Sequence, residues 1–329
     1  MRVKRNPHAG RRRSGGFGLS VFTEDELADI HLSTLEVLER TGVFVEQDEA
    51  IDIFSAGGCV IDRDKRVVKI PPHVVEEAIA SAPPSVFLAG RDAKDDIVLD
   101  ANRVGFTTFG EGIMIVDPYT GELREPLKKD VGDAARLADA MSEIDTFEIA
   151  IGAKDAPGET ASIHNFEAAL LNTTKCIGAG TLSTFETETV IDIAAVVAGG
   201  RDKLRERPIV YMGVCPVSPL KLTKEVCEVI ISAAKAGLPD NILSMAMSGG
   251  SAPVNLAGTL VTHNAEVLAG ITLAQLTNRG APVIYGSSTT AMDLRFATAS
   301  VGSPECAMIN AGVACLARQY RLPSYVAGA

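Results

Sequence analysis

The sequence is poor in the residues that build metal sites and disulfide frameworks. It has five histidines and six cysteines, no two of which form a CxxC pair, and no His/Cys/Asp cluster has zinc-site spacing. No secretory apolar segment is present, and no stretch reaches the roughly 18 uncharged apolar residues of a membrane helix. These absences argue against a disulfide scaffold, a zinc hydrolase and a membrane-spanning protein, and they favour a reduced, cytoplasmic location with no bound metal.

Signatures of several enzyme classes are also missing. The chain has no GxSxG nucleophile motif and no GxxxxGK[ST] phosphate loop. The nearest match to a dinucleotide-binding GxGxxG is the segment 178–183, which begins Gly178-Ala179-Gly180 but lacks the third glycine. Serine-nucleophile chemistry therefore lacks support, and nucleotide binding is only weakly indicated.

Charge is distributed unevenly along the chain. Acids outnumber bases by 42 to 31, yet the first thirteen residues contain six bases and no acid: Arg2, Lys4, Arg5, Arg11, Arg12 and Arg13. We expect residues 1–20 to form a basic, flexible tail on an acidic body. Contact of the tail with nucleic acid, an acidic partner or the body itself stays open as the alternative.

What is present is a well-patterned globular chain of 329 residues, 46% of them hydrophobic. Thr23 followed by Glu26 predicts a capping box, and apolar residues at helical spacing continue to Gly42. A second short helix is predicted over 46–56, a strand over 67–70, and a third helix opening at Pro71-Pro72. Residues 21–100 are thus expected to form a small N-terminal α+β region.

From residue 101 onward, short apolar runs alternate with amphipathic stretches. Helices are predicted near 130–142, 160–173, 186–198, 223–236, 255–278 and 304–320, and a turn-rich hairpin joins 113–116 to 121–124. The predicted strands are Val104–Phe109, Phe147–Gly152, Lys175–Gly180, Pro208–Val214, Asn241–Met247, Pro282–Ser287 and Leu322–Ala327. This alternation is typical of a parallel sheet, either an open doubly wound sheet or a closed (β/α)₈ barrel. The lack of a dinucleotide signature favours the barrel.

The number of predicted βα units can be compared with the length of the chain. Residues 101–329 hold six βα units and a seventh strand, whereas a barrel has eight units in about 250 residues. The expected fold class is therefore α/β, a TIM (β/α)₈ barrel that is incomplete and ends after strand 7. Either the fold is not a barrel or the chain is a fragment.

In a barrel, functional groups follow the carboxyl ends of the strands. Glu111, between two glycines after the first strand, is a candidate general base or cation partner, and His164 is a candidate acid or base near a helix start. Tyr285 and Ser287 end the sixth strand, where an aromatic ring and hydroxyls could cradle a small cation. The alternatives are a solvated carboxylate for Glu111 and a structural role for His164.

Four segments carry a resemblance to a known family. They are Ile30-His31-x-x-Thr34-Leu35-Glu36-Val37-Leu38-Glu39-x-Thr41-Gly42-Val43, Ile70-Pro71-Pro72-x-Val74-Val75-Glu76-Glu77-Ala78, Asn172-Thr173-Thr174-Lys175, and Leu322-Pro323-Ser324-x-Val326-Ala327-Gly328. Together they resemble the trimethylamine methyltransferase family, over essentially the whole chain.

The resemblance implies a barrel enzyme that moves a methyl group from trimethylamine to the Co(I) of a corrinoid. A separate cognate corrinoid protein carries that cofactor, so none is expected to bind directly to this chain. In the trimethylamine branch, pyrrolysine follows the Leu-Pro-Ser-x-Val-Ala-Gly-x segment, which places it directly after Ala329. Because trimethylamine is mostly a cation at neutral pH, Glu111, Phe109 or Tyr285 would select it. A homo-oligomer is expected, with no nucleic-acid partner.

Two alternatives remain at this point. One is the branch of the family that acts on glycine betaine or related quaternary amines without pyrrolysine. The other is that the 329-residue chain is a catalytically inert, truncated fragment of such an enzyme, ending at a UAG codon.

Overall fold

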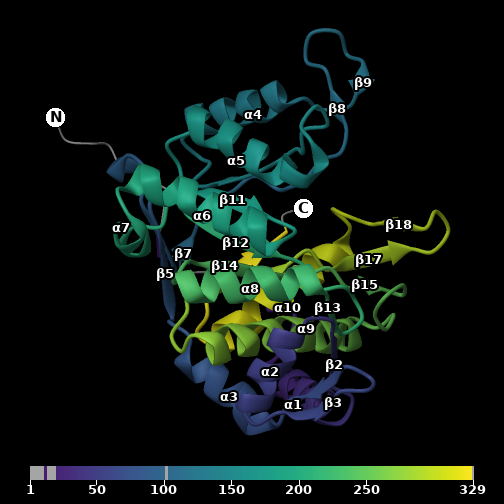
Figure 1. Ribbon diagram of the computed structural model, residues 1–329. Coiled ribbons are helices and arrows are strands. Elements are labelled where there is room, and N and C mark those ends of the chain that lie inside the picture. Colours follow the sequence, from purple (N-terminus) through teal and green to yellow (C-terminus); the bar gives the residue numbers. More distant parts are fainter. Residues whose placement is uncertain (1–10, 13–19, 101–102, 328–329) are drawn as a thin grey trace. The chain divides into compact units, whose positions relative to one another are not determined.

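The structure of the chain, a computed structural model, describes residues 11–12, 20–100 and 103–327. Figure 1 shows their helices and strands. Contacts within these residues group them into two units. Unit 1 comprises Arg11, Arg12 and residues 87–213, and unit 2 comprises residues 20–86 and 214–327. Each unit has its own parallel strands and its own covering helices, so the fold class is α/β as predicted.

Unit 1 is built on three parallel strands. They are β10 (Phe147–Glu148), β11 (Ile177–Gly180) and β12 (Val210–Val214), and both neighbouring pairs are parallel. The unit's helices are α4 (Lys128–Ala140), α5 (Ala161–Asn172), α6 (Thr184–Ala198) and α7 (Arg201–Glu206). The predicted helices 130–142, 160–173 and 186–198 are confirmed to within two residues at each end, whereas α7 was not predicted.

The first predicted strand, Val104–Phe109, is wrong as a regular strand. Its start belongs to β7 (Arg103–Val104), which pairs antiparallel with β1 (Arg11–Arg12). Beyond that, only isolated parallel bridges such as Thr107 to Thr146 remain. The physical reason lies in the hydroxyls, because Thr107 Oγ1 and Thr108 Oγ1 donate to the carbonyls of Thr146 and Glu148, where a regular ladder would use backbone N–H groups.

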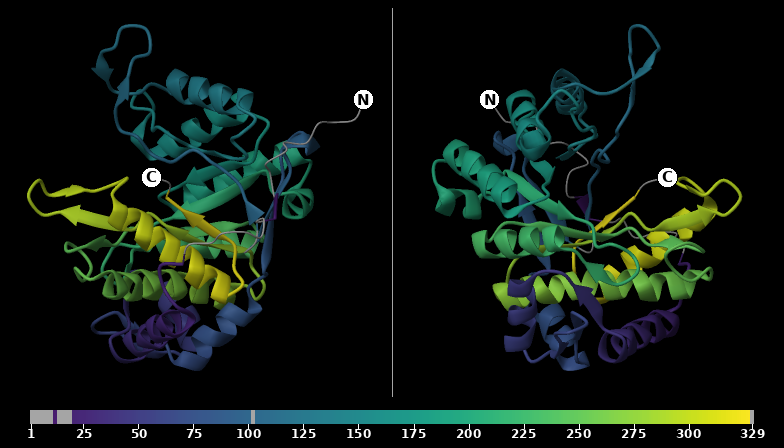
Figure 2. Two further views of the ribbon diagram at one scale, coloured as in Figure 1. Left: turned by 180° about the vertical axis from the view of Figure 1, so that it is seen from behind. Right: turned by 45° about the vertical axis from the view of Figure 1, so that its right-hand side comes forward.

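A hairpin follows this irregular segment, as predicted. It consists of β8 (Ile115–Val116) and β9 (Leu123–Arg124), and Figure 2 shows its loop projecting away from α4 and α5. Arg124 lies at its base and forms ion pairs with Asp117 and Asp130 at 3.0 and 2.7 Å. These pairs tie the hairpin to the first turn of α4.

Unit 2 also has three parallel strands: β14 (Asp240–Ser244), β16 (Val283–Ser287) and β19 (Ser324–Val326). Its helices α8 (Lys224–Ala236), α9 (Leu256–Thr277) and α10 (Pro304–Gln319) match the predicted ranges. The long helix α9 is buried over most of its length, and Gly270 on it allows Ile242 of β14 to approach closely. It is therefore the centre of the unit's core.

The N-terminal helices pack on α9. They are α1 (Glu24–Arg40), α2 (Asp48–Ala56) and α3 (Pro72–Ser81), and α1 begins with the predicted capping box of Thr23 and Glu26. A polar network stabilises the packing: buried His31 contacts the exposed Glu76 and the buried Tyr320, and buried Asn264 of α9 donates to Tyr320. The N-terminal region and the second half of the chain thus share one core.

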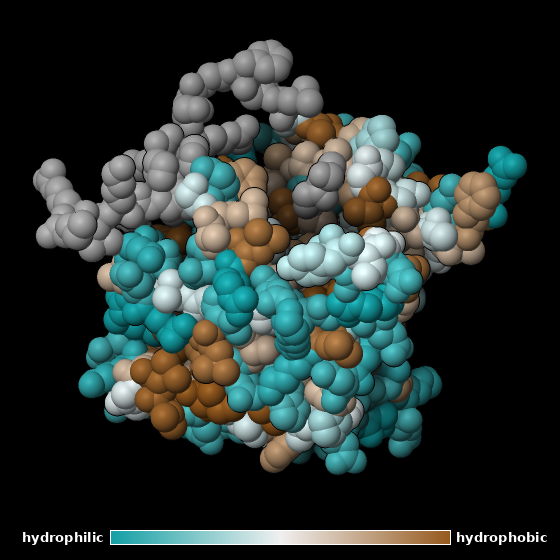
Figure 3. Space-filling view, turned by 90° about the horizontal axis from the view of Figure 1, so that it is seen from above, coloured by the Kyte–Doolittle hydropathy of each residue, from teal (hydrophilic) through white to brown (hydrophobic). Residues whose placement is uncertain are grey.

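The other elements of the described residues are short strands and two single helical turns. β2 (Val43–Val45), β3 (Val60–Asp62), β4 (Val67–Lys69) and β13 (Lys221–Leu222) form one sheet, and β15 (Met247–Ser248), β17 (Thr290–Asp293) and β18 (Thr298–Ala299) form another. β5 (Ser85–Leu88), β6 (Ile97–Asp100), η1 (Ala93–Asp95) and η2 (Gly158–Thr160) are the remaining elements. Among the described helices, none combines the length and the apolar character needed to span a membrane. On the face drawn in Figure 3, apolar patches are separated by hydrophilic side chains.

Candidate active site

A glutamate, a glycine and a tyrosine stand in one row across the three strands of unit 1. Glu148 of β10 is in register with Gly178 of β11, and Gly178 is in register with Tyr211 of β12. Residues in register on parallel strands point to the same face of the sheet. The tyrosine hydroxyl reaches across the intervening glycine and donates to Glu148 Oε2 at 2.6 Å.

Glycine at the centre of the row is a steric requirement. A Cβ atom at Gly178 would lie 2.1 Å from Glu148 Oε2 and 2.5 Å from the Tyr211 hydroxyl oxygen. The next row on the same face pairs Gly180 with Gly213, and a Cβ at Gly180 would meet nothing within 4 Å. The face beside the carboxyl group is therefore open.

The position of Glu148 changes its acidity. Burial raises its pKa to about 7, the hydrogen bond from Tyr211 opposes this shift, and the charge of Glu111 adds to it. Near neutral pH, Glu148 is thus divided between its charged and neutral forms. A carboxyl group in this range can hold or release a proton under physiological conditions.

Glu111, the candidate from the sequence, belongs to the same cluster. Its Oε2 lies 3.0 Å from the place where a Cβ on Gly152 would stand, so the glycine allows it to lie against the segment after β10. Desolvation raises its pKa, the charge of Lys154 opposes the shift, and the charge of Glu186 adds to it. Glu111 is nevertheless exposed.

Two neighbouring side chains have clear structural roles. Glu186 is buried in the first turn of α6, where its Oε2 accepts from the backbone N–H of Leu182 at 2.8 Å. Asn165 is buried on α5 and accepts from the N–H of Ala153 at 3.1 Å. They hold the loops that follow β11 and β10, the strands that carry Gly178 and Glu148.

His164 lies on α5, one residue from Asn165, and contacts the side chains of Lys128 and Glu167. Its Nδ1 is 2.9 Å from Lys128 Nζ, which also donates to Glu167 at 2.5 Å. The histidine is thus held in a surface ion cluster between α4 and α5. Its role as an acid or base remains a prediction.

The proposed substrate-binding residues are divided between the two units. Phe109 is in unit 1, two residues before Glu111, and 52% of it is exposed. Tyr285 and Ser287 are in unit 2 and are fully buried. Tyr285 donates its hydroxyl to Asn264 of α9 at 2.6 Å, and Ser287 Oγ accepts from the N–H of Thr289. Their role in substrate binding stays a prediction, and the site described here is built on residues of unit 1.

Within the described residues, no group of three or more His, Cys, Asp or Glu side chains is arranged to hold a metal ion.

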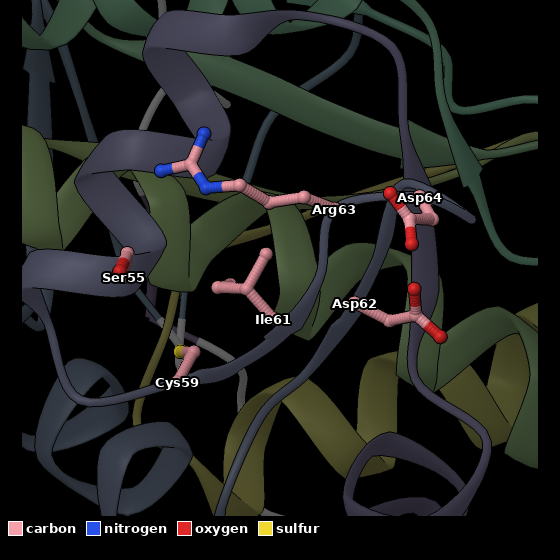
Figure 4. A pocket seen from close by; sticks show the side chains of 6 residues that line it. All are labelled: Ser55, Cys59, Ile61, Asp62, Arg63 and Asp64. Carbon is pink, nitrogen blue, oxygen red and sulfur yellow. The ribbon is translucent and has the colours of Figure 1, made fainter.

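A pocket of about 690 Å³ lies in unit 2, lined by Ser55, Cys59, Ile61, Asp62, Arg63 and Asp64 (Figure 4). Arg63 points away from the two carboxylates and pairs instead with Asp52 at 2.5 Å. The side chain of Asp62 accepts from the backbone N–H of Lys65, which marks the segment as a turn.

Glu148 and Tyr211 were missed by the sequence analysis. One signal was available for Glu148, because it is the single charged residue in the apolar run Phe147–Ile151. Tyr211 has no local signal, since an aromatic residue inside a strand is ordinary. Only the register of the strands brings it to Glu148.

Comparisons with known proteins agree with this architecture. The sequence profile of the family described as "Trimethylamine methyltransferase (MTTB)" matches residues 11–329. The crystal structure of monomethylamine methyltransferase (MtmB) from Methanosarcina barkeri superposes with a TM-score of 0.55 at 14% identity, covering 92% of this chain and 67% of that one. At this identity the likeness concerns the fold alone.

Two curated relatives place the chain within the family. It is 52% identical to trimethylamine methyltransferase MttB of Desulfitobacterium hafniense (strain DSM 10664 / DCB-2), over 99% of this chain and 66% of that protein. It is 32% identical to glycine betaine methyltransferase of D. hafniense (strain Y51), over 94% of this chain and 64% of that protein. The chain thus spans about two thirds of the length of these relatives, and it belongs to the trimethylamine methyltransferase family.

Proposed function

We propose that the full-length protein transfers a methyl group from trimethylamine to the reduced cobalt of a corrinoid carried by a separate protein. The observation that carries this proposal is the 52% identity to a trimethylamine methyltransferase, compared with 32% to a glycine betaine methyltransferase. We therefore assign to this protein the substrate named for the more similar relative, trimethylamine.

The strands and helices of the two units support a (β/α)₈ barrel as the fold of the full-length protein. Each unit contributes three parallel strands with helices between them, which is the repeating element of such a barrel. The relatives are about half as long again as this chain. We infer that the remaining third of their length supplies the further units of the barrel.

The site of unit 1 fits a small organic cation. Glu148 lies in β10 and Glu111 in the segment before β8, and the two carboxyl groups are close enough that the charge of Glu111 raises the pKa of Glu148. A carboxylate close to a bound trimethylammonium ion stabilises it electrostatically, most strongly where water is excluded. In this proposal Glu111 attracts the substrate to the site and holds it in place.

Methyl-transfer assays on the full-length protein with its corrinoid partner test the proposal. We expect methylation of the reduced cobalt, followed by its visible spectrum, with trimethylamine and not with glycine betaine. Glu111→Gln should raise KM for trimethylamine about tenfold through loss of a charge-assisted contact. The exposed Glu122→Gln is the matched control and should leave KM unchanged. Transfer from glycine betaine alone would instead place the protein in the other branch.

The position after Ala329 has its own test. We propose, from the resemblance of residues 322–328 to the trimethylamine branch, that pyrrolysine follows Ala329 in the full-length protein. Trypsin cleaves after Arg321, so the peptide that begins at Leu322 contains this position. Its mass in protein from the native cell should include the pyrrolysine residue, and an ordinary amino acid there would contradict the proposal.

A further inference from the structure

The row of Glu148, Gly178 and Tyr211 gives the two carboxylate oxygens of Glu148 different surroundings. Oε2 accepts the Tyr211 hydroxyl at 2.6 Å. Oε1 lies on the side of Gly213, 3.7 Å from the place where a Cβ on that residue would stand. The tyrosine therefore fixes one oxygen and leaves the other directed along a face that has glycines in place of side chains.

The face beside Oε1 carries no side chain at two positions. Gly180 and Gly213 are in register in the row beside Glu148, and a Cβ on Gly180 would meet no atom within 4 Å. Side chains at these two positions would fill the space over the sheet. Their absence leaves room for methyl groups next to a hydrogen-bond acceptor of fixed orientation.

Tertiary and quaternary ammonium ions differ in one feature that such an acceptor can recognise. A trimethylammonium ion carries one N–H, whereas a quaternary ammonium ion carries none and presents only methyl or methylene groups. Charge alone does not separate them, because both are monovalent cations. A site built to accept an N–H rejects an analogue that lacks it far more strongly than an apolar pocket rejects an extra methyl group.

We propose that Glu148 is the specificity-determining residue of this site, accepting the single N–H of trimethylammonium on Oε1 while Tyr211 positions the carboxylate through Oε2. The inference rests on the proposed function, since it takes a methylated amine as the ligand. Glu111 supplies charge that attracts either kind of cation, and Glu148 distinguishes between them.

The proposal predicts that the affinity for trimethylammonium depends on pH. Only the ionised form of Glu148 binds the cation by a charge-assisted bond, so affinity for trimethylammonium should rise as the pH rises through about 7. The hydrogen bond from Tyr211 lowers the pKa of Glu148. Tyr211→Phe should therefore move the midpoint of this rise upward, by about one pH unit.

Titration calorimetry on the full-length protein, with trimethylammonium and tetramethylammonium chloride as probes, tests the assignment. At pH 8 the wild-type protein should bind trimethylammonium at least about tenfold more tightly than tetramethylammonium. Glu148→Leu should bring this ratio close to one. Tyr211→Phe should keep the ratio at high pH but show the shifted midpoint. Glu122→Leu and Tyr119→Phe, both at exposed positions of the hairpin, should behave as wild type.

Circular dichroism identifies the variants that retain the fold. If Glu148→Leu does not fold, the Tyr211→Phe variant decides the test. A folded Glu148→Leu protein with the wild-type ratio, or a Tyr211→Phe midpoint that does not move, would overturn the inference. These outcomes are separate from a failure of the proposed function. A wild-type protein that discriminates between the two cations but transfers no methyl group would refute the function and leave the role of Glu148 intact.

Discussion

Gly178 shows how a single missing side chain shapes the site. The Tyr211 hydroxyl occupies the space directly over it and reaches Glu148. Because the Gly178 backbone has no positive φ, its requirement is steric and not conformational. Any larger residue must displace one of the two partners.

We expect Gly178→Ala to destabilise the protein by about 1–3 kcal/mol, the usual cost of an extra methyl group in a packed site. Gly180→Ala, on the same strand and the same face, is the matched control because its new Cβ would meet no atom within 4 Å. Urea unfolding of both variants measures the difference. Equal midpoints for the two would show that the row of Glu148, Gly178 and Tyr211 is not packed as described.

Helices were the elements that the sequence predicted best. Their apolar periodicity and their caps are local, so Thr23, Glu26 and Gly42 define α1 without reference to the rest of the chain. The strand over 67–70 and the β8–β9 hairpin were predicted, but short strands such as β2 and β13 were missed for the opposite reason. β2 pairs with β13, whose Lys221 and Leu222 are far away in the sequence, and two- or three-residue strands carry no periodicity of their own.

The same contrast applies to the site. Glu111 was predicted because glycines surround it after a strand-like run, which is a local pattern. Glu148 and Tyr211 are defined by strand register, which no local pattern contains. The hydrogen bond from Tyr285 to Asn264 of α9 likewise joins two separate elements, so no local pattern contains it.

The capping box of α1 gives a prediction at the scale of one element. The side chain of Thr23 accepts from the backbone N–H of Glu26, and Glu26 accepts from the N–H of Thr23 at 2.8 Å. Thr23→Ala should cost about 1 kcal/mol of local stability. Hydrogen exchange of the first-turn amides of α1 measures it, and faster exchange is expected. Thr160 precedes α5 without a side-chain cap, so Thr160→Ala should leave exchange in α5 unaltered.

Stability of the whole molecule should depend on pH through Asp240. This residue begins β14, is buried, and has no hydrogen-bond partner for either carboxylate oxygen among the described residues. Burial raises its pKa to about 8, from about 3.8 in the unfolded chain. As the pH rises, the unfolded chain therefore loses the Asp240 proton before the folded protein does. The free energy of unfolding falls as the pH rises from about 4 to about 8.

Asp240→Asn, which is neutral at every pH, should remove this loss. We expect the variant to gain stability relative to wild type as pH rises from 5 to 8, measured as the difference in urea midpoints. Asp25→Asn, at an exposed position of α1, should show a constant difference across the same range. An Asp240→Asn difference that is independent of pH would mean that Asp240 is already ionised in the folded protein.

The discontinuous composition of unit 2 affects how the chain is made. Helices α1, α2 and α3 leave the ribosome early, yet the helix on which they pack, α9, is synthesised only after all of unit 1. Leu27, Ile30 and Leu35, which are buried in the finished fold, must meanwhile remain without their partner. Apart from Arg11 and Arg12, unit 1 consists of residues 87–213, which are synthesised within this interval and can fold during it. We therefore expect the nascent N-terminal segment to be the part of the molecule that depends most on a chaperone.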